Sequence, residues 1–514
     1  MTHSSETAPA SEQSDKSLPQ AEMLLSFLQE EDILLFRDEF QEPYIRMTVD
    51  GHREVWPVAS KTTSRYLEHL FWKKKQKAIG RQGLEQVIGE LEARALFDGE
   101  EISLALRTMW HEGNIWIDLC DKQWRAVCVT PAGWRIVDDP PVLFRRLKHQ
   151  RPLLVTEERG DIHQLDVFMS NLDEDALFLL KVYLVTCLVP DLVHVILYVL
   201  GEQGSMKSTF SKMLRLLVDP SKPLLLTLHL KVEELVQQLS HHHFPCYDNV
   251  SYIPPSISDT LCRSSTGDGY SRRKLYTDNE DITFEYRCSV LLNGIALATH
   301  RADLLERCLY LHLSRIPKAQ RKPERAIWKE FEKQRPIIFA GMLDVLSLAL
   351  RFHPTIQLKE HPRMADFAEW GCAIAQAMGE KPERFLHAYE ENTSLQHEEV
   401  IQANPIALAV RVMMQHRNEP WDGSPTKLLN KLVKTAEKEG IDVKQREWPR
   451  SPAALTYKLN IVKTNLREMG IEFRTERRTR GERFVVLTKL PQDEGDVSGD
   501  ASGGSAAPPI VSEF

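Results

Sequence analysis

The chain has 514 residues, with 65 Lys and Arg against 73 Asp and Glu, so its net charge is −8 at pH 7. A hydrophobic share of 42% and a charged share of 27% are those of a soluble globular protein with room for three or four domains. The eight cysteines are scattered without a C-x-x-C pair. This excludes a zinc ribbon and a disulfide framework and favours a reducing cytoplasm. Charged residues and Pro190 interrupt the longest apolar run, residues 176–200, so neither a membrane span nor a membrane partner is predicted.

Residues 1–20 are polar and are predicted to be disordered, and residues 21–155 are predicted to form a mixed α+β N-terminal domain. A helix is expected over residues 84–96, and three alternating strands follow it. Tryptophans and arginines interleave along those strands, at Trp116, Trp124, Arg125, Trp134 and Arg135. They could stack on single-stranded nucleic acid, but tryptophans in strands more often belong to a core, and we prefer that interpretation.

A phosphate-binding loop is predicted after the apolar run at residues 193–200. That run predicts a strand buried on both faces, and a helix with one apolar face is expected from Lys207 to Val218. Between them the spacing G-x-x-x-x-G-K-[ST] is kept, except that Met206 stands where glycine is usual. The predicted nucleotide-binding residues are Gly201, Glu202, Gln203, Gly204, Ser205, Met206, Lys207, Ser208 and Thr209.

The residue types of this loop explain its chemistry. Backbone N–H groups at the start of the helix point at phosphate oxygens, Lys207 would reach the β- and γ-phosphates, and Ser208 would take a place on Mg²⁺. ATP and Mg²⁺ are therefore the expected cofactors. An accidental strand–helix junction is disfavoured because the strand, the spacing and the helix agree.

A carboxylate for the same Mg²⁺ is predicted at Asp248, at the end of a short apolar segment. Pro245 is awkward in a central strand, and Asn249 stands where a second acid is usual, so the group that activates water is not identified. His241, His242 and His243 lie just upstream, but adjacent residues of a strand point to opposite faces and cannot readily share one metal ion.

A hairpin is predicted over residues 271–286, because two strand-like segments flank a polar turn. Its first arm carries three cations, Arg272, Arg273 and Lys274. Asn293 ends the next buried strand, where its amide could orient the attacking water. Either Arg301 or Arg307, just before a further strand at residues 308–313, could reach the nucleotide of a neighbouring subunit.

The segments GEQGSMKST, DNVS, SDTLCRSSTGDGYSRRKLYTD, VLLNGI and RADLLERCLYLHL resemble the helicase-like ATPases of phages and mobile genetic elements. These are similar to superfamily III and minichromosome-maintenance AAA+ motors, and the resemblance covers mainly residues 173–318. It implies a homo-hexameric ring with nucleotide between subunits and a hairpin facing single-stranded DNA. By motif position it assigns Walker A to Lys207 and Ser208, Walker B to Asp248 and Asn249, sensor 1 to Asn293, and the arginine finger to Arg307, with Arg301 as the alternative.

The expected fold is therefore an α/β P-loop AAA+ core over residues 156–318, followed by a helical lid and connector over 319–418, in which no sensor 2 arginine is recognisable. Residues 426–489 hold 16 Lys and Arg against 8 Asp and Glu. Two helices and a hairpin with a basic tip predict a winged helix over residues 419–490, before a disordered tail at 491–514. Its predicted contacts with duplex DNA are Lys458, Lys463, Arg477, Arg478 and Arg480.

These features favour an ATP-dependent, helicase-like DNA motor in the replication of a phage or mobile element. A DNA-binding ATPase that is not a motor, such as an initiator or a loader, stays open because Asn249 replaces the second acid. A small-molecule P-loop kinase is disfavoured, because it would not need the basic hairpin or the winged helix.

Overall fold

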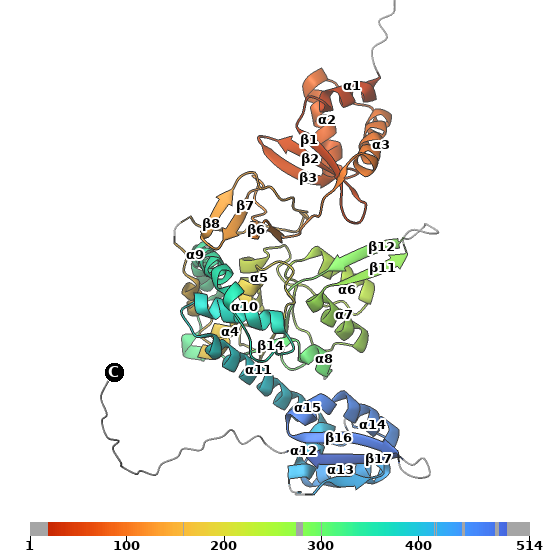
Figure 1. The fold of residues 1–514 in the computed structure, drawn as a ribbon, viewed down its shortest axis with the longest axis vertical. Helices are drawn as coiled ribbons and strands as arrows, with labels where there is room; N and C mark the ends of the chain where they lie inside the picture. Colours follow the sequence, from red (N-terminus) through yellow and green to blue (C-terminus); the bar gives the residue numbers. More distant parts are fainter. Residues whose placement is uncertain are drawn as a thin grey trace, which may run out of the picture. The chain divides into compact units, whose positions relative to one another are not determined.

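The computed structural model describes residues 19–157, 159–273, 281–299, 301–415, 417, 419–444, 448–477 and 483–490. It divides the chain into two compact units, Met1–Thr393 and Ser394–Phe514, which are described separately below. Figure 1 labels their helices and strands. Of the two segments predicted to be disordered, residues 1–18 of 1–20 and all of residues 491–514 lie outside the described residues.

The first unit begins with a mixed α+β region, as expected from the sequence. Its sheet has the order β3-β2-β1-β4. Alternating residues of β2, such as Ile45 and Met47, are buried against Leu67 and Leu91 of two helices. The elements are α1 (Gln20–Leu28), β1 (Ile33–Arg37), β2 (Pro43–Val49), β3 (His52–Pro57), α2 (Lys61–Lys75), α3 (Arg81–Phe97) and β4 (Glu100–Glu101).

An antiparallel sheet of order β5-β6-β7-β8 follows and contains the three strands predicted there. Its strands are β5 (Thr108–His111), β6 (Asn114–Asp118), β7 (Ala126–Thr130) and β8 (Gly133–Val137). The tryptophans have packing roles: Trp116 is buried, and Trp134 Nε1 donates to Asp344 Oδ1 at 2.8 Å. Trp124 lies under the Arg146 guanidinium, 4.0 Å from the ring centroid. The core interpretation of these side chains is therefore the better one.

A parallel sheet of order β10-β13-β9-β14 forms the centre of the first unit. Its strands are β9 (Ile196–Gly201), β10 (Cys246–Tyr247), β13 (Leu291–Gly294) and β14 (Cys308–Leu313). β9 is buried on both faces, as its apolar run predicts. Pro245 directly precedes β10 and takes part in the sheet only as an acceptor, from Leu291 N at 3.0 Å, so its missing N–H is tolerated.

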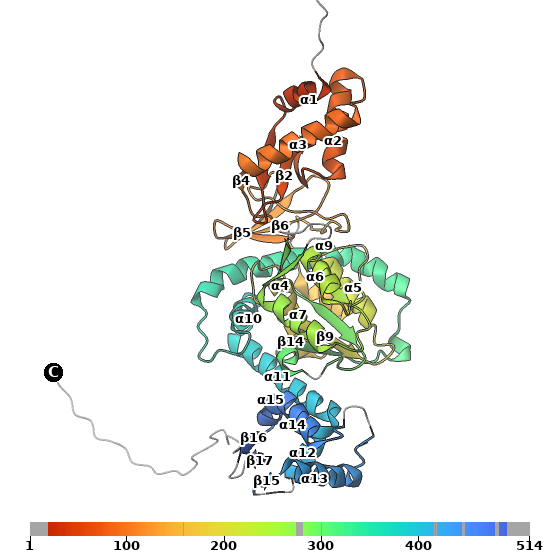
Figure 2. The same ribbon diagram turned by 90° about the vertical axis from the view of Figure 1, so that its right-hand side faces the viewer.

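Helices cover the central sheet (Figure 2). They are α4 (Glu174–Thr186), α5 (Lys207–Val218), α6 (Val232–His241), α7 (Pro255–Thr266), α8 (Ala302–Leu305), α9 (Glu324–Phe352) and α10 (Ala365–Ala377). By length and composition alone α9 could cross a membrane, but 61% of its apolar window is buried in the protein. Phe331, Ile338 and Met342 of α9 belong to the main core. The predicted hairpin is confirmed as β11 (Asp268–Arg273) and β12 (Asp281–Tyr286), which pair antiparallel.

The second unit contains a three-stranded antiparallel sheet of order β15-β17-β16 and a group of helices. Its elements are α12 (Pro405–Gln415), β15 (Trp421–Gly423), α13 (Pro425–Lys438), α14 (Pro452–Ile461), α15 (Lys463–Glu468), β16 (Ile471–Arg477) and β17 (Arg483–Lys489). The helices and the hairpin predicted for the winged helix are present. α12 differs from the expectation of a connector, because Ile406, Val410 and Met413 are buried in the core of this second unit. Helix α11 (Pro382–Ala403) spans the boundary between the two units.

Candidate nucleotide site

The loop between β9 and α5, which is predicted to bind phosphate, turns tightly. Gly201 has no room for a side chain, since a Cβ there would lie 2.6 Å from Ser205 Oγ and 2.7 Å from Leu313 O. Gly204 and Met206 both have positive φ, +82° and 63°. The departure at Met206 therefore has a definite consequence: a residue with a side chain occupies the left-handed region, at a cost of about 1 kcal/mol. The Ser205 hydroxyl is fully buried and has no hydrogen-bond partner among the residues that the structure describes.

Lys207 lies across this loop. Its Nζ donates to Gly201 O at 2.6 Å and to Glu202 O at 2.9 Å. The side chain is buried, and desolvation lowers the pKa of Lys207, while Asp248 acts in the opposite direction. Both of its oxygen partners are neutral loop carbonyls, so a phosphate oxygen could replace them with a stronger, charge-assisted partner.

Ser208 and Asp248 come together from α5 and from the end of β10. The Ser208 hydroxyl donates to the two carboxylate oxygens of Asp248, at 2.9 and 3.2 Å. A hydroxyl beside a carboxylate at the start of a P-loop helix is the oxygen donor set that Mg²⁺ takes in nucleotide sites. The residues present therefore fit a magnesium–nucleotide complex.

Asn293 and Asn249 form a second polar contact at the same edge of the sheet. The backbone N–H of Asn249 donates to Asn293 Oδ1 at 3.0 Å, and Asn249 has a positive φ of 57°. Asn293 Nδ2 donates to Ser211 Oγ at 2.9 Å, and Ser211 Oγ donates to Lys207 O at 2.9 Å. Asn293 is fully buried. It therefore connects the end of β10 to the P-loop helix, and its role toward water stays a prediction.

The two arginine-finger candidates lie beside α7 and α8 and are held by carboxylates. Arg301 Nη2 donates to Asp259 Oδ1 at 2.6 Å, and Arg307 Nη2 lies 3.7 Å from Asp303 Oδ1. Arg363 also pairs with Asp303. Within the described part of this chain, neither candidate hydrogen-bonds to the phosphate loop. An action on a neighbouring subunit's nucleotide stays a prediction.

Asn171 braces the phosphate loop and is not apparent from the sequence. Its Nδ2 donates to Ser205 O at 3.0 Å and to Ser314 O at 3.2 Å. Its own carbonyl accepts from Ser314 N at 3.1 Å. Asn171 precedes α4 and has no motif around it, so no sequence signal would have revealed it.

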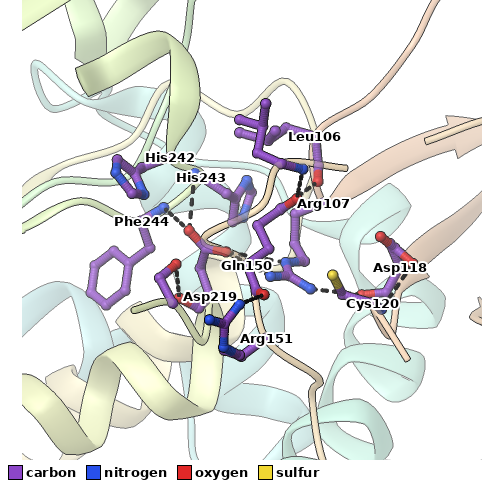
Figure 3. A network of polar contacts seen from close by, with 12 residues as sticks. Leu106, Arg107, Asp118, Cys120, Gln150, Arg151, Asp219, His242, His243 and Phe244 are labelled. Carbon is purple, nitrogen blue, oxygen red and sulfur yellow. Dashed lines mark hydrogen bonds and ion pairs between the residues drawn. The ribbon is translucent and has the colours of Figure 1, made fainter. Parts of the chain in front are cut away.

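A buried polar network lies at the other end of α5 (Figure 3). Arg107 Nη2 donates to Asp219 Oδ1 at 2.7 Å, while Asp219 Oδ2 accepts from the backbone N–H groups of His243 and Phe244 at 3.1 and 3.2 Å. Arg215 Nη2 lies 2.7 Å from His242 Nδ1. The network ties the C-terminal end of α5 to the segment that leads into β10.

The ionisation of this network follows from its burial and its charges. Burial acts to raise the pKa of Asp219, but Arg215 and Arg107 outweigh it and hold that pKa well below its usual range. Burial, reinforced by Arg215, lowers the pKa of His242 to about 3. Burial also lowers the pKa of His243, whose Nε2 lies 2.7 Å from Cys187 O. These histidines thus have protein partners, and among the described residues no metal-binding cluster includes them.

The predicted DNA contacts lie on the β11–β12 hairpin of the first unit and on two helices and the β16–β17 hairpin of the second. Arg272 and Arg273 are on β11 of the first unit, whereas Lys274 lies outside the described residues. In the second unit Lys463 and Arg477 are exposed and Lys458 is half-buried, while Arg478 and Arg480 lie outside the described residues. Arg477 stands opposite Arg483 in the register of β16 and β17. Like charges facing each other are unfavourable in a hairpin, and an anionic partner such as DNA would relieve the repulsion.

Two family models match parts of this chain. Residues 163–395 match the model described as the actinomycete integrative conjugative element replication protein, and residues 406–502 match the AICE RepA C-terminal domain. No curated protein matches the chain.

Two solved structures resemble the chain weakly. The apo structure of the NrS-1 C-terminal region is 11% identical, with a TM-score of 0.41 and coverage of 92% of this chain and 100% of that chain. A small-molecule complex of JCV Helicase is 14% identical, with a TM-score of 0.21 and coverage of 43% and 71%. At TM-scores below 0.5 these resemblances do not establish a shared fold.

Proposed function

We propose that this chain, which matches the AICE RepA models over residues 163–395 and 406–502, uses ATP hydrolysis to move DNA strands when an actinomycete integrative conjugative element replicates. The replication role comes with the family. The motor activity is a proposal from the residues of the chain, and we expect it to operate in the cytoplasm.

The observation that carries the proposal is the meeting of Lys207, Ser208 and Asp248 at the carboxyl edge of the parallel sheet. Ser208 and Asp248 are within hydrogen-bond distance, and Lys207 spans the loop beside them. Mg²⁺ would supply charge neutralisation for the terminal phosphates. Lys207 would bind those phosphates, Ser208 and Asp248 would hold the ion, and loop N–H groups would orient the nucleotide.

DNA contacts and assembly complete the proposal. We assign single-stranded DNA to the β11–β12 hairpin, which leads directly into the strand that ends near Asn293. Duplex DNA is assigned to the winged-helix cations, because phosphate contacts come from exposed Lys and Arg. The proposed assembly is a homo-hexamer in which Arg307, or alternatively Arg301, acts on the neighbouring subunit's nucleotide.

The test is ATP turnover by the full chain with and without single-stranded DNA. The wild type should hydrolyse ATP faster when single-stranded DNA is present, and Lys207→Ala should reduce turnover to background because the loop loses its cation. Lys212→Ala, which removes a cation further along the same helix, is the matched control and should behave like the wild type. Turnover by Lys207→Ala at the wild-type rate would contradict the proposal.

The alternative is a DNA-binding ATPase in which nucleotide only orders the assembly, as in an initiator or a loader. It is favoured by Asn249, whose backbone N–H contacts Asn293 and whose side chain lacks the charge of a general base. Strand displacement from a forked duplex separates the two functions. ATP-dependent displacement supports the motor, whereas nucleotide-dependent DNA binding without displacement supports the alternative.

A further inference from the structure

The segment that follows β14 is fastened to the phosphate loop. Leu313 O lies so close to Gly201 that a Cβ there would be 2.7 Å from it. One step further along the chain, Asn171 Nδ2 bridges the carbonyl oxygens of Ser205 and Ser314. The start of this segment and the loop therefore form one braced structure.

The guanidinium of Arg321, at the end of the segment 314–321 that follows β14, lies near the loop. Its Nη2 lies 3.6 Å from the position that a Cβ of Gly204 would occupy. Its Nε donates to Ile316 O at 3.1 Å, which leaves the two Nη groups at the outer end of the side chain. The side chain is exposed, and no carboxylate pairs with it in the part of the chain that the structure describes. Its two Nη groups are therefore available to a ligand at the loop.

We propose that Arg321 is a second phosphate-binding cation of the same chain and that it distinguishes ATP from ADP. The inference rests on the proposed nucleotide site. Lys207 contacts the loop at Gly201 and Glu202, whereas Arg321 approaches it at Gly204. A ligand in the loop would thus meet cations from two directions.

The chemistry of the guanidinium suits the outermost phosphate. Its planar fork can donate two parallel hydrogen bonds to phosphate oxygens, which an ammonium group cannot do. Because Arg321 comes from outside the loop rather than from the P-loop helix, it should reach the terminal phosphate rather than those buried under the helix N-terminus. ADP lacks that phosphate and should therefore depend less on Arg321.

Arg321 differs from the two arginine-finger candidates in its partner and in its distance from the loop. Arg301 pairs with Asp259 and Arg307 with Asp303, and over the described ranges neither side chain hydrogen-bonds to the loop. Arg321 has a backbone carbonyl as its partner and lies next to the loop. A cation without a carboxylate is the one that gains most from binding an anion.

Equilibrium binding of ADP and of AMP-PNP, a non-hydrolysable ATP analogue, to the full chain tests the inference. Arg321→Ala should weaken AMP-PNP binding roughly tenfold or more, the loss expected for a charge-assisted hydrogen bond, and ADP binding by less than about threefold. Arg321→Lys should fall between Arg321→Ala and the wild type. Lys322→Ala removes the neighbouring cation and should leave both affinities unchanged.

Three outcomes would overturn the inference. One is an equal loss of AMP-PNP and ADP affinity in Arg321→Ala, and another is an equal effect of Lys322→Ala. The third is that Arg321→Ala binds both nucleotides with wild-type affinity while Lys207→Ala binds neither. That result would refute the role of Arg321 but would still support the proposed nucleotide site. Failure of the wild type to bind either nucleotide would instead refute the proposed function. Thermal unfolding without nucleotide should be the same for Arg321→Ala and the wild type, which excludes a folding defect.

Discussion

At the scale of single residues, Met206 shows what glycine normally contributes to a phosphate loop. Its φ of 63° lies where side chains are disfavoured, so glycine is usual there for its backbone freedom. We expect Met206→Gly to keep nucleotide affinity, because it removes the conformational cost without touching Lys207 or Ser208. The greater freedom of glycine in the unfolded chain offsets this gain, so the free energy of unfolding should change by less than about 1 kcal/mol.

Met206→Val should behave differently from Met206→Gly, so we compare the two variants. A β-branched residue is a genuine outlier at positive φ, so we expect it to weaken both stability and nucleotide binding. Denaturant unfolding and nucleotide titration of the two variants measure these effects. If Met206→Gly loses affinity as strongly as Met206→Val, the Met206 side chain itself contacts the ligand and the backbone explanation fails.

Individual site residues differ in how far the sequence predicts them. Lys207 and Ser208 are readable because a loop between a strand and a helix fixes their spacing locally. Asn171 and Arg321 both approach this loop but lie far from it in the sequence. Asn171 precedes Ser205 by 34 residues, and Arg321 follows the P-loop helix and β14. No local pattern encodes such a meeting, because it depends on how β14 and α4 pack. For the same reason the sequence leaves the choice between Arg301 and Arg307 open.

At the scale of elements, α5 is held at both ends, by the phosphate loop at one and by the buried network at the other. The elements of the central sheet are largely readable from the sequence, since β14 has the bounds that its apolar run predicts. The sequence does not show that β10 is a two-residue edge strand, because its extent depends on pairing with β13. The sequence also does not show that α12 packs in the second unit, because an apolar helix face does not specify the core against which it packs.

The histidines beside α5 predict a dependence of stability on pH. Burial lowers the pKa of His242 from 6.5 to about 3, so between these values the unfolded chain binds a proton that the folded chain excludes. The contribution of His242 to the free energy of unfolding is therefore complete above pH 6.5 and is lost as the pH falls from 6.5 toward 3. Burial lowers the pKa of His149 and His241 as well, which adds to the effect.

Urea unfolding at about pH 7.5 and about pH 5.5 measures this dependence. We expect a lower free energy of unfolding at the lower pH, and a smaller difference in His242→Asn, whose amide oxygen can still accept from Arg215. His229→Asn changes a more exposed histidine, paired with Glu234, and is the control. An unchanged difference in His242→Asn would show that this histidine does not set the pH dependence.

The two basic hairpins should contribute differently to DNA binding. Arg477→Ala removes an exposed cation of the winged-helix hairpin, so it should weaken duplex binding and reduce the salt slope by about one unit, without changing basal ATP turnover. Arg273→Ala in β11 should do the reverse, with near-normal duplex affinity and a loss of stimulation by single-stranded DNA.

Duplex titrations at several salt concentrations and ATPase assays measure both effects. Lys438→Ala removes an exposed cation at the end of α13 and is the control for Arg477→Ala. Normal stimulation and strand displacement by Arg273→Ala would refute the assignment of the β11–β12 hairpin to the single strand.

At the scale of the whole molecule, the two units divide the proposed functions. The proposed nucleotide residues and the β11–β12 hairpin lie within Met1–Thr393, and the cations of the predicted winged helix lie within Ser394–Phe514. The family models divide the chain similarly, with one match ending at residue 395 and the next beginning at 406. We therefore expect that substitutions can alter nucleotide turnover and duplex binding separately.

The assembly of whole molecules gives the last prediction. If Arg307 acts on the neighbour's nucleotide, Arg307→Ala and Lys207→Ala should each lack ATP turnover while a mixture of the two regains it. In an equal mixture of a closed ring, the required intact loop and intact arginine meet at roughly a quarter of interfaces, so up to about a quarter of the wild-type rate is expected. A parallel mixture with Arg301→Ala decides between the two arginines, because only the variant of the true finger loses turnover alone and is rescued. If neither mixture regains activity, and the protein has the mass of a monomer in the presence of ATP, the ring is refuted and each chain must complete its nucleotide site alone.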